Sequence, residues 1–147
     1  MKNKVDESEK RKWINAALKA FDTGRWAETM LRALGSRVAK RWKFVSFRGK
    51  KGGEWCGIVD VLAIRKNTSK RSKDCLKRGD LFDIILIQIK GGKARLPSPS
   101  DIRRLKAVAS YYRAKHILLY EWRRQRISQF KVWDRSWKPV KAADIFG

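Results

Sequence analysis

Residues 81–90 read LFDIILIQIK, a nearly unbroken apolar run that has the length of one β-strand. Runs of this kind are typical of a central strand that is covered on both faces. Gly91 and Gly92 follow directly and predict the end of the strand. We therefore expect an α/β fold in which this segment lies inside a mixed sheet flanked by helices.

Two strand-like segments precede this run and are typical of a hairpin. Residues 42–48 alternate between large apolar and polar side chains, and the glycine-rich residues 49–53 predict a turn. Residues 57–64, GIVDVLAI, predict the second arm of the hairpin. The basic and polar residues 65–80 then predict a loop that leads into the central strand.

Downstream of the run, the sequence predicts a helix and further strands. The segment Ser98–Asp101 is typical of a helix start, with Ser98 as the N-cap and a proline at the first helical position. We expect this helix to continue to about Ala114. Residues 116–122, HILLYEW, predict a fourth strand, and residues 129–133 predict a fifth.

Upstream of the hairpin, apolar residues at spacings of three and four indicate two helices. One is expected over residues 10–21 and the other over residues 25–41, with residues 22–24, Asp-Thr-Gly, separating them. We expect residues 1–9 to be disordered. The length of the chain, residues 1–147, favours a single domain.

The charge of the chain indicates a polyanionic partner. Its 37 Lys and Arg against 14 Asp and Glu give 37 − 14 = +23, with an isoelectric point near 10.7. Self-repulsion at this charge lowers stability, and a bound polyanion relieves it. Nucleic acid is favoured over a membrane surface because the basic residues are spread along the chain rather than confined to one amphipathic helix.

Several other classes of protein are disfavoured. The chain has only two cysteines, Cys56 and Cys75, and one histidine, His116, which argues against an ordinary zinc site and against a disulfide framework. The N-terminal residues lack the apolar segment of a signal peptide, and no apolar run is long enough to span a membrane. We expect a cytoplasmic, nucleoid-associated protein with no membrane partner.

Three polar side chains interrupt the apolar strands and are candidates for chemistry. Asp60 lies in the middle of residues 57–64, where an ionised carboxylate is costly unless a cation or hydrogen-bond donors satisfy it. A divalent metal accounts for this burial, and an aspartate that holds a turn or an ion pair is the alternative. Gln88 and Lys90 lie two residues apart, so on a strand they point to the same face. Each alone has a simple structural role, but together they form a polar cluster at one end of the sheet.

With these residues the chain resembles the PD-(D/E)XK nuclease superfamily, which includes Holliday-junction resolvases and many restriction endonucleases. The family core is a helix, a three-stranded meander, a helix and a final strand, the order expected here for residues 25–122. Its signature is an Asp on the second strand and an acid-any-Lys triplet on the third, matched by Asp60 and Gln88-Ile89-Lys90. The resemblance implies a restriction endonuclease-like core with an extra N-terminal helix.

The resemblance also implies a Mg²⁺ or Mn²⁺ site. Asp60, the Gln88 side-chain oxygen and the main-chain carbonyl of Ile89 would coordinate the metal, which would polarise the phosphate and activate a water molecule. Lys90 would orient that water and stabilise developing charge. Glu28 occupies a place comparable to a glutamate on the first helix of archaeal-type junction resolvases, and would hold a second metal or a bridging water. A role for Glu28 confined to the helix dipole is the equal alternative.

One position departs from the family pattern. Gln88 stands where the family has an acid, which removes one negative charge from the metal site, although some branches of the superfamily tolerate this glutamine. Glu54 shares strand parity with Asp60 and is a backup ligand. Asp83 lies five residues before Gln88, so we expect it to point to the opposite face and to be structural.

Basic residues in the hairpin, the 65–80 loop and the segment that follows the central strand are expected to contact phosphates. Such contacts position a nucleic acid without reading its sequence, and they make binding steeply salt-dependent. The candidates are Lys43, Arg48, Lys50, Lys51, Arg65, Lys66, Lys70, Arg71, Lys73, Lys93, Arg95, Arg103 and Arg104.

The leading hypothesis is a metal-dependent endonuclease that acts on double-stranded or branched DNA, of the junction-resolvase type. Resolvases of this fold act as two-fold dimers, so the resemblance implies a homodimer. A non-catalytic nucleic-acid-binding protein that retains a nuclease scaffold is the alternative. A restriction-like enzyme that acts with partners is less favoured, because the chain has no specificity domain.

Overall fold

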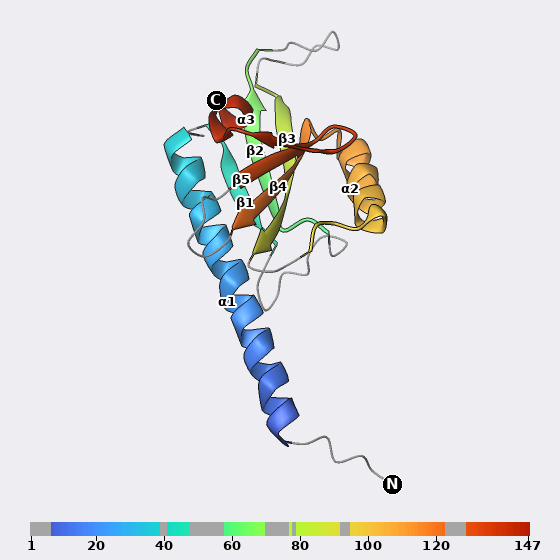
Figure 1. Cartoon of the computed structure of the whole chain (residues 1–147). Helices are drawn as coiled ribbons and strands as arrows, with labels where there is room; N and C mark the ends of the chain where they lie inside the picture. Colours follow the sequence, from blue (N-terminus) through green and yellow to red (C-terminus); the bar gives the residue numbers. More distant parts are fainter. Residues whose placement is uncertain are drawn as a thin grey trace.

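The element order expected for the core is confirmed. The computed structural model describes residues 7–38, 41–47, 58–69, 77, 79–91, 95–122 and 129–147, and within the first helix it describes only some of the side chains. The elements in chain order (Figure 1) are α1 (Glu7–Val38), β1 (Lys43–Ser46), β2 (Val61–Asn67), β3 (Leu81–Gly91), α2 (Pro99–Tyr112), β4 (His116–Trp122), β5 (Gln129–Trp133), β6 (Trp137–Val140) and α3 (Ala142–Phe146).

In the part of the chain that the structure describes, the strands form one six-stranded mixed sheet in the order β1-β2-β3-β4-β5-β6. All neighbours are antiparallel except β3 and β4, which are parallel. Parallel neighbours need a crossover connection, and α2 supplies it between these two strands. The C-terminal ends of β3 and β4 and the N-terminus of α2 consequently lie at the same end of the sheet.

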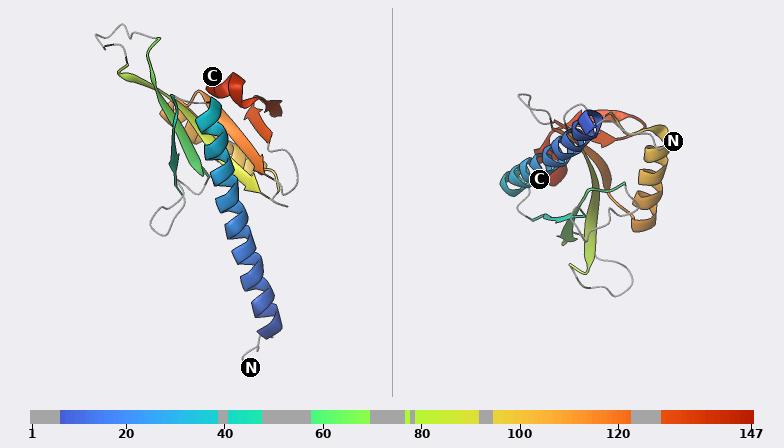
Figure 2. Two further views of the ribbon diagram at one scale, coloured as in Figure 1. Left: turned by 90° about the vertical axis from the view of Figure 1, so that its left-hand side faces the viewer. Right: turned by 90° about the horizontal axis from the view of Figure 1, so that it is seen from below.

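Helices cover both faces of the central strands. Figure 2 shows α1 and α3 on one face of the sheet and α2 on the other. Ile85, Ile87 and Ile89 of β3 belong to the core between the sheet and the α1/α3 side, whereas Leu86 packs with Leu105 of α2. Alternate residues of β3 are therefore buried on opposite faces, which explains its continuous apolar sequence. This confirms the central position predicted for residues 81–90.

The two N-terminal helices predicted from the sequence are one continuous helix. Helix α1 runs from Glu7 to Val38, so residues 22–24 do not interrupt it, and residues 7–9, expected to be disordered, form its first turn. One interior glycine costs about 1 kcal/mol relative to alanine, whereas a break requires a second costly helix nucleation. The end of α1 beside the sheet is anchored by the fully buried Leu31, and the N-terminal half extends past the sheet (Figure 1).

Strand β2 is shifted along the sequence relative to the prediction. It begins at Val61 rather than near Gly57, and Arg65–Asn67, expected to lie in a loop, are its last residues. Arg65 and Asn67 donate hydrogen bonds to the Asp83 carboxylate of β3, each at 3.0 Å. These polar pairs hold the basic end of β2 in the sheet, where no apolar side chain marks a strand.

The start of α2 follows the prediction closely. The Asp101 N–H donates to Ser98 Oγ at 3.1 Å, and the Ser98 N–H donates to Asp101 Oδ2 at 3.0 Å. In this reciprocal capping box, each of the two side chains accepts a hydrogen bond from a backbone N–H, so two N–H groups at the helix N-terminus are satisfied. The helix ends at Tyr112, and its C-cap residue Arg113 has a left-handed φ of 54°.

Two C-terminal elements, β6 and α3, were not predicted. The turn between β5 and β6 places Arg135 at a φ of 59°, and arginine is not a turn residue by which a hairpin is recognised. Helix α3 has only five residues, but Ile145 and Phe146 are buried, and the Trp42 indole N–H donates to the Phe146 carbonyl at 3.0 Å. Among the described residues, no helix combines the length and the hydrophobicity needed to cross a membrane.

Candidate functional site

Asp60 lies at a bend directly before β2, at the end of the sheet where β3 terminates. The sequence predicted Asp60 in the middle of a strand. This prediction is wrong, because β2 begins only at Val61, the residue after Asp60. Its backbone is nevertheless fixed on both sides, because its N–H donates to the Ile87 carbonyl at 3.1 Å and its carbonyl accepts from the Phe47 N–H at 3.0 Å. The residue is 6% exposed.

The Asp60 carboxylate contacts the predicted triplet through its middle residue. Its Oδ2 accepts a hydrogen bond from the Ile89 N–H at 2.6 Å. Ile89 lies between Gln88 and Lys90, so the structure brings the two parts of the sequence motif together. A hydrogen bond to an ionised acceptor is stronger than a neutral one, and this bond holds the carboxylate beside the triplet. The structural role considered for Asp60, holding the backbone, is therefore present.

Gln88 carries a buried acceptor that the described residues leave unsatisfied. The side chain is 6% exposed, and its Oε1 has no hydrogen-bond partner among the residues that the structure describes. Such an orphaned acceptor costs about 1–3 kcal/mol. An amide oxygen and a carboxylate are hard donors of the kind that Mg²⁺ takes. The donor set of Gln88 and Asp60 thus fits a divalent cation in chemical type.

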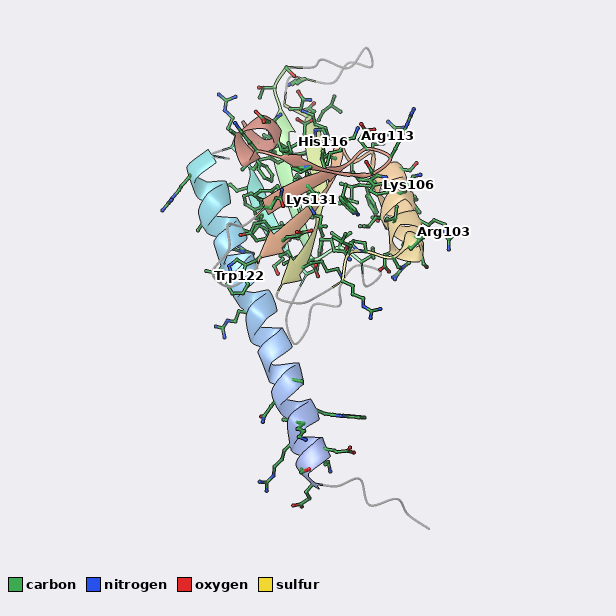
Figure 3. The ribbon with its side chains drawn as sticks, in the orientation of Figure 1. Arg103, Lys106, Arg113, His116, Trp122 and Lys131 are labelled. Carbon is green, nitrogen blue, oxygen red and sulfur yellow. The ribbon has the colours of Figure 1, made fainter. Side chains whose placement is uncertain are left out.

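Lys90 shares a face of β3 with Gln88 and lies near the N-terminus of α2. The hydrogen bonds with the Ser98 backbone and side chain lower the pKa of Asp101; burial opposes them, and the positive charges of Lys90 and Arg104 add to the lowering. Figure 3 shows the labelled Arg103 of α2 at this end of the molecule. The ammonium group therefore lies at the sheet end that Asp60 occupies.

Glu121 is a second carboxylate at this end that the sequence analysis missed. It is the register partner of Lys90 in the parallel β3–β4 pair, and parallel register partners share a face of the sheet. Its Oε1 accepts from Lys131 Nζ at 3.0 Å, with the two side chains 15% and 21% exposed. The sequence did contain a signal for this residue, because Glu121 is the lone acid in the apolar strand HILLYEW. Lys90 consequently has an acidic neighbour that the motif does not include.

The remaining acidic candidates do not complete a metal site in the described part of the chain. Glu28 lies in α1, which covers the opposite face from Gln88 and Lys90, and its side chain is outside the described residues, as is Glu54. Among described residues, no group of three or more His, Cys, Asp and Glu side chains is arranged to hold a metal. The ligand role of Glu28 stays a prediction.

Asp83 is structural, as expected. Burial raises the pKa of its carboxyl, but the hydrogen bonds from Arg65 and Asn67 and the charges of Lys115 and Arg65 outweigh that effect and hold the pKa below its ordinary value. The carboxylate lies in the first half of β3, away from the end at which Gln88 lies. It therefore stabilises the sheet rather than the candidate site.

The predicted phosphate contacts fall into three groups. Arg65 is engaged internally, because it pairs with Asp83 and its guanidinium lies 4.5 Å from the centre of the Trp42 ring. Exposed and described are Lys43, Lys66, Arg95, Arg103 and Arg104. Outside the described residues lie Arg48, Lys50, Lys51, Lys70, Arg71, Lys73 and Lys93.

Comparisons with known proteins give a remote structural likeness. No protein-family model matches the chain, and no curated protein sequence matches it. The chain is similar to the 1.6 Å structure of Hjc, a Holliday junction resolvase from the archaeal hyperthermophile Archaeoglobus fulgidus, with 14% sequence identity and a TM-score of 0.45. The alignment covers 79% of this chain and 96% of that chain. At this level of similarity, function has to be inferred from the side chains of the protein itself.

Proposed function

We propose that the protein is a metal-dependent nuclease whose active site is built around Asp60, Gln88 and Lys90. The main support for this proposal is the 2.6 Å hydrogen bond from the Ile89 N–H to Asp60 Oδ2. This bond holds the buried carboxylate of Asp60 beside the Gln88-Ile89-Lys90 triplet. The unsatisfied Gln88 Oε1 supports it, since a shared cation would remove the cost of leaving that oxygen without a partner.

Asp60, the Gln88 side-chain oxygen and the Ile89 carbonyl would hold Mg²⁺ or Mn²⁺. When bound, such an ion supplies Lewis acidity and a water of lowered pKa. The Ile89 N–H holds one carboxylate oxygen of Asp60 and so fixes the orientation of the group. Lys90 would bind the phosphate and stabilise negative charge that develops on it. Because Gln88 is neutral, this site has one negative charge fewer than a site with an acid there and would bind the metal more weakly.

The proposed substrate is DNA, double-stranded or branched. The net charge of +23 and the exposed cations of β1, β2 and α2 support a polyanion. Contacts between cations and phosphates carry no sequence information, so we propose selection by shape rather than by sequence. A two-fold homodimer is proposed from the family resemblance alone.

The test is cleavage of labelled four-way junction, linear duplex and single strand with Mg²⁺, with Mn²⁺ or with a chelator. We expect metal-dependent cleavage that is lost in Asp60→Asn and in Lys90→Ala while DNA binding is retained. Asp60→Asn is the informative variant, because its amide oxygen can still accept from the Ile89 N–H. The matched control is Asp134→Asn, which changes an exposed acid paired with Lys138 in the β5–β6 turn.

A non-catalytic nucleic-acid-binding protein is the second candidate function. The neutral side chain at Gln88 and the lack of a three-acid group among the described residues favour it. It predicts that the wild type binds all three substrates without cutting them, in either metal, and that Asp60→Asn binds equally well. That result would overturn the nuclease proposal.

A further inference from the structure

A basic pocket lies at the end of the sheet opposite to the candidate site. It has a volume of about 650 Å³ and lies where the start of β1, the end of β2 and the start of β3 meet. Among the described residues, no acidic side chain lines it. The lining residues are Arg41, Lys43, Ile64, Arg65, Lys66, Thr68 and Phe82.

The pocket and the candidate site share one face of the sheet but not one location. Lys66 is the register partner of Phe82, and Phe82 lies six residues before Gln88 on β3, so alternation places both on the same face. Asp60 and Lys66 are separated by six residues of extended chain, which corresponds to roughly 20 Å. The pocket is therefore a separate surface at the far end of the same face.

Phe82 is exposed in the middle of these cations. Its side chain is 54% exposed, directly across from Lys66 in the β2–β3 pair. A single exposed aromatic residue is ordinary on a protein surface, but Phe82 lines a pocket whose charged lining residues are all cations. An aromatic face beside positive charges is the combination that holds a nucleobase and its phosphate.

The cations of the pocket differ in what they can bind. Arg65 is already held by Asp83 and by the Trp42 ring, so it forms part of the wall. Arg41, Lys43 and Lys66 are exposed, and no described acid pairs with any of them in the pocket. These three cations are therefore the groups that would meet phosphate, and the two lysines are the ones that lie on strands of the sheet.

We propose that this pocket receives an unpaired nucleotide, whose base stacks on Phe82 while neighbouring phosphates contact Lys43 and Lys66. The nucleotide has to be unpaired, because the faces of bases inside a duplex are covered by the adjacent base pairs. The inference rests on the proposed function in taking nucleic acid as the partner, but it does not depend on cleavage. It adds single-stranded ends and flaps next to duplex to the substrate class.

The distance between the pocket and the candidate site determines how many nucleotides of a bound strand lie between them. A strand that stays stacked as in a duplex, with a rise of about 3.4 Å for each nucleotide, spans the roughly 20 Å from the pocket to the candidate site in about six nucleotides. An overhang of that length on a duplex is therefore the appropriate probe.

The test compares dissociation constants for a blunt duplex and for a duplex with an overhang of about six thymidines, with equal total phosphate and with chelator present. We expect the wild type to bind the overhang substrate about tenfold more tightly. Phe82→Ala removes this preference, and Phe82→Trp keeps it, because tryptophan retains a stacking face. Trp13→Ala is the matched control, since Trp13 is an aromatic residue 74% exposed on α1, away from the pocket.

The lysines are tested by the salt dependence of overhang binding. Lys43→Ala and Lys66→Ala should each reduce the slope of log affinity against log salt by about 0.7. Lys138→Ala, on the opposite edge strand β6, should leave this slope unchanged.

Several outcomes overturn the proposal, and they separate it from the nuclease proposal. If Phe82→Ala keeps the overhang preference, or if Trp13→Ala loses it equally, the pocket does not hold a nucleotide, whether or not the protein cuts DNA. Binding of phosphatidylserine vesicles that Phe82→Ala abolishes, with the overhang preference intact, assigns the pocket to a membrane surface instead. A wild type that binds no nucleic acid contradicts both proposals, whereas a wild type that shows the preference but never cuts DNA contradicts only the nuclease proposal.

Discussion

The two candidate functions, a metal-dependent nuclease and a non-catalytic nucleic-acid-binding protein, make the most different predictions for Gln88. Its amide oxygen is buried and has no partner among the described residues. A cation shared with Asp60 would satisfy this oxygen, and without a cation the fold carries the cost of burying it. Substitutions that change only the charge at this position therefore distinguish the two functions.

We expect Gln88→Glu to couple stability to Mg²⁺. The added carboxylate lies beside the same β3 backbone that Asp60 contacts, so without metal the two acids repel each other and the melting temperature falls. Mg²⁺ that binds only the folded state stabilises it more as its concentration rises above the dissociation constant, so the melting temperature should rise with Mg²⁺ by several degrees more than in the wild type. Calorimetry measures both effects, with Asn15→Asp, which adds one exposed carboxylate on the N-terminal half of α1, as control. Equal Mg²⁺ responses in the two variants would rule out a cation site at Gln88.

Asp60 also stabilises the backbone, which gives a second prediction at the scale of one residue. Asp60→Ala leaves the buried Ile89 N–H without its acceptor, so we expect a loss of about 1–3 kcal/mol in the free energy of unfolding. Asp60→Asn keeps an oxygen acceptor and should lose clearly less. Urea denaturation compares the two variants. Equal losses would mean that the hydrogen bond to Ile89 does not stabilise the fold.

At the scale of elements, polar pairs decide where strands and helices end. Asp83 holds Arg65 and Asn67, and this extends β2 beyond its apolar part. The capping box of Ser98 and Asp101 fixes the start of α2 beside Lys90. The ends of these elements, and with them the pocket and the candidate site, depend on such polar contacts as much as on the apolar core.

The contact between β2 and β3 should be pH-dependent. Because the pKa of folded Asp83 is below its ordinary value of 3.8, the ionised form stabilises the fold above that value, and this contribution is lost as the pH falls through the folded pKa. Asp83→Asn should therefore lower the free energy of unfolding by about 1 kcal/mol at pH 7. The difference from the wild type should shrink as the pH falls below 3.8 and disappear below the folded pKa. Denaturation series at several pH values measure it, and a difference that persists at low pH would contradict the assignment. Asp134→Asn, at an exposed ion pair, should have little effect throughout.

At the scale of the whole molecule, the proposed nucleotide pocket and the candidate site lie on one shared face of the sheet. The pocket lies at one end of this face and the candidate site at the other, and α2 covers only its central part over β3 and β4. Under the two proposals, the long-range attraction of the net charge would bring DNA to the protein. The geometry of the face would then determine which phosphate reaches Asp60.

If both proposals hold, the cut should fall a fixed distance from the point where duplex becomes single strand. We expect cleavage about six nucleotides from the nucleotide held at Phe82. Phe82→Ala should spread the cuts over several positions without abolishing them, because it removes the anchor and leaves the metal ligands in place. Sequencing gels of end-labelled substrates map these positions. Unchanged cut positions in Phe82→Ala would show that the pocket does not determine which phosphate is cut.

Much of the core could be predicted from local patterns. The apolar run of β3, the strand HILLYEW and the Ser98 cap are each specified within a few residues, and each is confirmed. The start of β2 was misplaced because Ile58 and Val59 are apolar and buried although they lie outside the strand. The β6 strand was missed because its turn contains Arg135 rather than a glycine.

By itself, the sequence determined the central strand, the basic character of the protein and the pairing of Gln88 with Lys90 on one strand face, because these depend on residue type and on the two-residue period of a strand. Only the tertiary structure decided that Asp60 Oδ2 meets the Ile89 N–H, that Glu121 lies beside Lys90, and that Phe82 lies among cations. The physical reason is that contacts between strands follow from their register, and register is set by the packing of the whole sheet.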